Sequence, residues 1–77
     1  MREILVNRVY RHFKENKYKV VCIANDSETE EKVVVYQAIY GEYGYWVRPY
    51  DMFNSLVDKE KYPHVQQKYR FELIENE

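Results

Sequence analysis

The residues from Lys32 to Phe53 constrain the fold more than any other part of the chain. They begin with a run of mostly β-branched and aromatic residues at 33–40, which suits a pleated, half-buried surface. Apolar side chains fall on both faces of this run, so we expect a central strand that is covered on both sides. Two glycines at 41–44 permit a tight turn, because glycine takes positive φ angles without steric cost. The chain then returns as a partner strand at 45–48, which Pro49 ends because it has no N–H to donate.

The remaining segments complete a predicted all-β fold. Alternating apolar and polar residues predict strands at 9–14, 18–24 and 68–74. After the hairpin, apolar residues at helical spacing predict a helix of one to two turns that begins near Asp51. The acidic segment 25–31 has no apolar residue and predicts a solvated turn held by its own side chains. About five short strands with one short helix before the last strand are typical of a small SH3-like barrel.

The same alternation predicts the core. Val35 and Val47 are expected inside the barrel on paired strands, with Phe71 nearby. Cys22 lies within an apolar run and is expected to be a small buried hydrophobic residue.

Length, tyrosine content and charge together suggest a single domain that associates with a second copy. The 77 residues form one domain, 1–77, because chains divide into domains only at greater lengths. A domain of this size has a small core, and the chain has nine tyrosines and a net charge of only −1. These properties favour self-association, so we expect a homodimer that forms through an edge strand or a tyrosine-rich face.

Several classes of function are disfavoured. The net charge of −1 gives no overall field that would attract nucleic acid or an anionic membrane. One cysteine excludes an internal disulfide and a cysteine-only metal site, and we expect no metal and no cofactor. No apolar run reaches the ~18 residues that a membrane span requires. The first seven residues do not form a signal peptide, so we expect a soluble, cytoplasmic protein.

Several short motifs resemble those of the bacterial and phage family known as domain of unknown function 1653. They cover about residues 9–57 and comprise Tyr-Arg-His-Phe-Lys at 10–14, Tyr18 and Val20, Ser-Glu-Thr at 27–29, Val-Val-Tyr-Gln-Ala at 34–38, Tyr-Gly at 40–41, Trp-Val-Arg-Pro at 46–49 and Met-Phe at 52–53. Arg8 stands where the family commonly has glycine, and Asp26 stands where it commonly has histidine before the Ser-Glu-Thr. The resemblance implies an SH3-like barrel and supplies no function.

An enzymatic function rests on few residues. His12 and Glu28 offer the groups of an acid–base pair, which would suit a small hydrolase. Ser27 is accompanied by neither a glycine elbow nor an oxyanion-hole motif. A hydrogen-bonded structural histidine is the simpler interpretation of His12, so we assign no catalytic residue.

A binding function has more support. Trp46, Arg48 and Tyr50 alternate along one strand, and Tyr36 and Tyr40 lie on the strand expected beside it. Aromatic rings beside an arginine can stack on a flat ligand while the guanidinium holds a phosphate or carboxylate. The alternative is structural, with Arg48 in a cation–π contact or in an ion pair with Glu28 or Glu42.

Gln37 is the polar residue among apolar neighbours of the central strand, and His12 completes the candidate set. Gln37 either contacts a ligand or satisfies the backbone of a loop. Residues 2–19 hold six Lys or Arg against two Glu, which would help a small barrel bind single-stranded nucleic acid, although exposed lysines usually serve only solvation. We therefore predict a non-enzymatic binding module for a nucleotide-like or phosphate-bearing ligand or short nucleic acid. The alternative is a protein- or peptide-interaction module.

Overall fold

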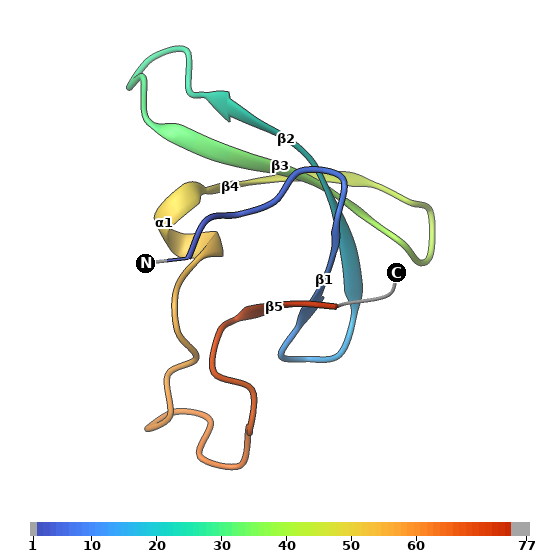
Figure 1. Ribbon diagram of the computed structural model, residues 1–77, viewed down its shortest axis with the longest axis vertical. Coiled ribbons are helices and arrows are strands. Elements are labelled where there is room, and N and C mark those ends of the chain that lie inside the picture. Colours follow the sequence, from blue (N-terminus) through green and yellow to red (C-terminus); the bar gives the residue numbers. More distant parts are fainter. Residues whose placement is uncertain (1, 75–77) are drawn as a thin grey trace.

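A computed structural model describes residues 2–74 and contains one five-stranded antiparallel sheet (Figure 1). The elements in chain order are β1 (Val9–His12), β2 (Lys17–Asn25), β3 (Lys32–Ala38), β4 (Tyr45–Pro49), α1 (Tyr50–Phe53) and β5 (Phe71–Leu73). Their order across the sheet is β4-β3-β2-β1-β5. The predicted all-β fold, with five strands and one short helix before the last strand, is confirmed. Within the described residues, no helix is long and apolar enough to cross a membrane.

The sheet curls around an aromatic core. Val34, Tyr36 and Ala38 alternate along β3 and are at most 5% exposed, so one face of this strand is buried. The rings of Phe53 and Phe71 stack against this face with their centroids 4.1 Å apart. Other large residues of the core are Tyr10, Val20 and Ile4. Tyr10 and Tyr36 thus join two phenylalanines in the core, whereas Tyr40, Tyr43 and Tyr45 are exposed.

The other face of β3 is not covered, which corrects two predictions. Val35 and Val47 lie on paired strands as expected, directly opposite each other, but Val47 is 62% exposed, and Val35 is only partly buried. The prediction that both lie inside a barrel is wrong, as is the prediction of a strand covered on both sides. The reason is that a single sheet with one four-residue helix can enclose only its concave face.

A bulge in β2 corrects a third prediction. The pairing of β2 with β3 shifts register between Val20 and Cys22, so one extra residue enters β2. Beyond the bulge, Ile23 takes the buried side and Cys22 is exposed. A bulge inverts the alternation of every residue that follows it, which the apolar pattern alone does not show.

The edges of the sheet approach each other through side chains. β4 and β5 occupy the two ends of the strand order, and no backbone ladder joins them in residues 2–74. The Cζ atom of Arg48 on β4 instead lies 5.5 Å from the ring centroid of Phe71 on β5. The amino-terminal segment also contacts this region, where Arg2 donates to the backbone carbonyl of Phe71 and to the side chain of Asn54.

Candidate functional site

The segment at 54–70, between α1 and β5, extends away from the sheet without forming a strand or helix (Figure 1). Loops of this length are uncommon inside a compact domain and are usually either functional or disordered. Its conformation is fixed by side chains that reach backbone carbonyls: Lys59 donates to Val65 and Gln67, and the Gln67 amide donates to Arg11 and Tyr69. The contact with Arg11 ties the loop to β1. The loop therefore presents its side chains to the end of the sheet in a defined arrangement.

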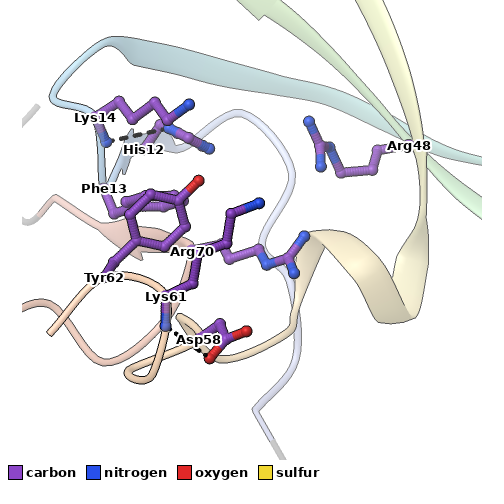
Figure 2. A pocket seen from close by; sticks show the side chains of 8 residues that line it. All are labelled: His12, Phe13, Lys14, Arg48, Asp58, Lys61, Tyr62 and Arg70. Carbon is purple, nitrogen blue, oxygen red and sulfur yellow. Dashed lines mark hydrogen bonds between the residues drawn. The ribbon is translucent and has the colours of Figure 1, made fainter. Parts of the chain in front are cut away.

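A pocket of about 360 Å³ lies between this loop, the turn from β1 to β2, and β4 (Figure 2). Such a volume is at the lower end of the range for small-ligand sites. The residues that line it are His12, Phe13, Lys14, Arg48, Asp58, Lys61, Tyr62 and Arg70. Four of the eight are cations that come from three separate parts of the chain.

The four cations have no carboxylate partner within the part of the chain that the structure describes. No carboxylate in residues 2–74 forms an ion pair with Lys14, Arg48, Lys61 or Arg70. The single acid that lines the pocket, Asp58, accepts backbone N–H groups of Glu60 and Lys61 at 3.0 and 3.3 Å and so stabilises its own turn. Of the two structural alternatives for Arg48, the ion pair with Glu28 or Glu42 does not form, whereas a cation–π contact does. The pocket thus concentrates positive charge in a protein whose net charge is −1.

His12 is a neutral hydrogen-bond donor within this positive field. Burial lowers the pKa of its imidazole to about 4, and nearby positive charges act in the same direction. These charges are, in decreasing order of effect, those of Arg48, Lys14 and Arg70. The backbone N–H of Lys14 donates to Nδ1 at 3.2 Å, so the neutral ring carries its proton on Nε2.

Aromatic rings form one wall of the pocket. The rings of Phe13 and Tyr62 contact each other with centroids 4.8 Å apart, and the ring of His12 lies 4.5 Å from that of Phe13. The Nζ atom of Lys61 is 5.6 Å from the Tyr62 ring centroid. Figure 2 shows the Tyr62 hydroxyl directed toward the side of the pocket that holds His12. An anionic ligand with a flat ring would find two complementary surfaces in this pocket: the aromatic wall for its ring and the cations for its negative charge.

Arg48 links the pocket to the core. Its Nε atom donates to the hydroxyl of Tyr36 at 3.3 Å, and its Cζ atom lies over Phe71. Two of the residues predicted to act together, Arg48 and Tyr36, are therefore in contact. Tyr36 is only 5% exposed, so it orients Arg48 and presents no ring surface to a ligand.

The other predicted site residues lie elsewhere. Trp46 lies opposite Tyr36 across β3 and β4, but it is 57% exposed and does not line the pocket. The hydroxyl of Tyr40 is 2.8 Å from that of Tyr18, and the Tyr50 hydroxyl accepts the backbone N–H of Ile4. Of Trp46, Arg48 and Tyr36, only Arg48 lines the pocket.

Gln37 adopts the structural role that the sequence left open. Its side-chain amide donates to the backbone carbonyl of Tyr43 at 3.0 Å and so holds the turn between β3 and β4. Within that turn Gly41 has φ of 59° and Tyr43 has φ of 56°, so one of the two residues in the left-handed region is not glycine. The hydrogen bond from Gln37 compensates part of that backbone strain.

The structure separates the two residues of the suggested hydrolase. His12 lies beside the Lys17 end of β2, whereas Glu28 lies beyond the Asn25 end. The nine residues of β2 extend roughly 25 Å at the usual rise per residue, so His12 and Glu28 do not form an acid–base pair. Among residues 2–74 no cluster of His, Cys, Asp or Glu is suited to hold a metal ion.

Asp26 has a structural role in the turn between β2 and β3. Its Oδ1 atom accepts the backbone N–H groups of Glu28 at 2.8 Å and Thr29 at 3.1 Å, and these bonds lower the pKa of its carboxyl group. The side-chain-stabilised turn predicted here is confirmed. Asp26 stands where the resembled family commonly has histidine, and its carboxylate accepts hydrogen bonds from the backbone of the turn.

Sequence reasoning found two residues of the pocket, His12 and Arg48, and missed the others. Lys14 and Phe13 could have been found, since they follow His12 directly and lie in the same motif. Lys61 and Tyr62 belong to a segment without periodicity, and Arg70 is expected on the outward face of a strand at 68–74, whereas β5 begins only at Phe71. Nothing in the sequence indicates that these residues lie near His12.

The fold and the pocket together define a small all-β domain with a basic, aromatic-walled pocket at one end of its sheet. A family model described as "Protein of unknown function (DUF1653)" matches residues 8–73, so the chain belongs to that family. The match extends beyond the region recognised from short motifs and includes the loop and β5.

A solved structure supports the same assignment. The chain is similar to the crystal structure of a DUF1653 protein from Bordetella bronchiseptica, with 30% identity and a TM-score of 0.75. The similarity covers 91% of this chain and 87% of that one. The comparison with curated proteins gave no match.

Proposed function

We propose that this protein is a non-enzymatic binding module whose basic pocket holds a phosphate-bearing, nucleotide-like ligand. The observation that carries the proposal is the convergence of four cations that have no carboxylate partner among the described residues. Placing like charges together is unfavourable unless a counter-charge joins them. A phosphate group supplies that charge together with several strong hydrogen-bond acceptors.

The geometry assigns a role to each part of the pocket. Arg48 and Arg70 offer planar guanidinium groups, which suit bidentate contacts with phosphate oxygens. Lys14 and Lys61 are exposed at the rim and add charge that attracts the ligand. The rings of Phe13 and Tyr62 offer a surface for a base or another flat group.

A thermal-shift and calorimetric screen tests the proposal. The ligands are nucleoside phosphates, short oligonucleotides and proline-rich peptides, each added to the wild type, to Lys61→Ala and to Lys19→Ala. Lys19 is exposed on β2 outside the pocket, so both variants lose one positive charge, but only Lys61→Ala changes the site. We expect a phosphate-bearing ligand to stabilise the wild type and Lys19→Ala more than Lys61→Ala. Equal responses of the two variants would contradict the assignment of the pocket.

A peptide-interaction module is the second candidate, because of a separate feature. Tyr45, Trp46 and Val47 are consecutive on the edge strand β4 and are 66%, 57% and 62% exposed. An exposed edge with large side chains on both faces is the surface to which extended peptides add as an extra strand. Stabilisation by peptides alone, without a response to phosphate, would favour this candidate.

A further inference from the structure

We infer that the pocket takes a terminal phosphate of its ligand, a monoester or pyrophosphate rather than an internal diester, and that His12 takes up a proton when this phosphate binds. The inference rests on the proposed function and specifies the ligand of the same pocket. It depends on the charge of the pocket and on the environment of His12.

The charge of the pocket exceeds what a diester neutralises. Of the titratable side chains that line it, four are cations and Asp58 is the single acid. The Asp58 carboxylate accepts two backbone N–H groups and forms no ion pair with any of the four. An internal phosphodiester carries one negative charge, whereas a terminal phosphate carries about 1.5 to 2 at neutral pH. A terminal phosphate therefore compensates more of the positive charge in a volume of about 360 Å³.

His12 is positioned to respond to the additional charge. Its Nε2–H is available to donate to a phosphate oxygen, while its Nδ1 atom accepts the Lys14 N–H at 3.2 Å. The proton taken up from solvent therefore binds Nδ1, and the hydrogen bond from the Lys14 N–H is broken in that step. Two causes keep the ring neutral in the free protein, namely burial and the repulsion from surrounding cations. A bound dianion directly offsets the repulsion from the cations, because an adjacent negative charge favours the protonated ring.

Every segment that surrounds His12 contributes to this balance. The aromatic neighbours Phe13 and Phe71, with ring centroids 4.5 and 4.8 Å away, are uncharged and exclude water. The charged or titratable groups that share the pocket are Lys14, Arg48, Arg70, Lys61, Asp58 and Tyr62. The electrostatic potential at His12 is thus positive in the free protein, and a bound anion makes it less positive.

The first experiment compares a short thymidine oligonucleotide with and without a 5′-phosphate, together with adenosine 5′-monophosphate, by calorimetry. We expect the 5′-phosphorylated strand and the mononucleotide to bind at least about tenfold more tightly than the unphosphorylated strand, the effect of one charge-assisted hydrogen bond. Lys61→Ala should reduce this preference, and Lys19→Ala should preserve it. Equal binding of the two strands overturns the inference and leaves the proposed function intact. If no phosphate-bearing probe binds, both fail.

The second experiment follows the imidazole signals of His12 by NMR as a function of pH, with and without adenosine 5′-monophosphate. We expect the midpoint of the His12 titration to move to higher pH when the nucleotide is bound. His64, the other histidine of the chain, does not line this pocket and serves as an internal reference in the same spectra. Tight binding with an unchanged His12 titration would overturn proton uptake even if the phosphate preference holds.

Discussion

The guanidinium of Arg48 lies over the ring of Phe71, with its Cζ atom 5.5 Å from the ring centroid. Arg48 belongs to β4 and Phe71 to β5, the two edges of the sheet. This cation–π contact connects strands that no backbone ladder joins in the described chain. The contact also attaches Arg48, which lines the pocket, to the core. Arg48 therefore contributes both to the positive charge of the site and to the packing of the fold.

Replacement of Phe71 should lower the free energy of unfolding more than replacement of a surface residue does. Phe71 is 1% exposed and contacts the rings of His12, Tyr18, Tyr36 and Phe53. Phe71→Ala should lower the free energy of unfolding by about 3–5 kcal/mol, measured by urea denaturation. Glu60→Ala is the control and should change it by less than about 0.5 kcal/mol, because Glu60 is exposed in the loop at 54–70. Equal losses for the two variants would contradict the placement of Phe71 in the core.

Arg48→Lys separates the binding role of Arg48 from its structural role. Lysine keeps the charge but loses the planar group that covers Phe71 and donates to Tyr36. We expect the free energy of unfolding to fall by about 1 kcal/mol or less, as for other partly exposed cation–π contacts. Affinity for a phosphate-bearing ligand should fall by about tenfold or more, the loss of a charge-assisted bond. If Arg48→Lys melts the domain without any ligand present, Arg48 is a structural residue.

The low pKa of His12 predicts how stability depends on pH. The unfolded chain takes up a proton near pH 6.5, whereas the folded protein resists it until about pH 4. Stability contributed by His12 is therefore fully present above pH 6.5 and is lost as pH falls toward about 4. His12→Gln, which has no titratable group, should show a shallower decline in urea midpoints between pH 7.5 and 4.5. Parallel curves for the two proteins would mean that His12 is not shielded from protonation.

Asp26 should make stability depend on pH in a second, more acidic range than His12 does. Its carboxyl pKa is lowered by the backbone N–H groups of Glu28 and Thr29, so its contribution is present at neutral pH and is lost as pH falls through that lowered value. Asp26→Ala should destabilise the turn at pH 7 and have a smaller effect at pH 2. The comparison of Asp26→Ala with wild type at both pH values checks this prediction, and an equal loss at each would contradict it.

The exposed edge strand supports the expectation of a homodimer. β4 presents Tyr45, Trp46 and Val47 to solvent, and β-strand edges of this kind pair readily with another copy. Sedimentation at micromolar concentration should give a dimer, and Val47→Lys should shift it toward monomer because a charge at an edge opposes strand pairing. A single species of 9.5 kDa for the wild type would exclude the dimer.

The strands, the hairpin and the acidic turn could be predicted from the sequence, because each depends on neighbours close in the chain. The run at 33–40 and the Pro49 terminus predicted the pairing of β3 with β4. The register, with Val35 opposite Val47 and Tyr36 opposite Trp46, is known only from the structure. Which face is buried could not be predicted. Both faces of β3 are apolar, so alternation does not distinguish them, and the bulge after Val20 inverts the rest of β2.

The pocket itself is a product of the tertiary structure. His12 and Arg48 stand out in the sequence as single residues, but they become neighbours only because the sheet curls and brings β1 close to β4. Lys61 and Arg70 join them because the loop at 54–70 is anchored to β1 through Gln67. Local sequence determines secondary structure through backbone preference and side-chain alternation. The convergence of charges from distant segments depends on long-range packing, which in this chain is set by the stacking of Phe53 on Phe71 and by how the sheet curls around these rings.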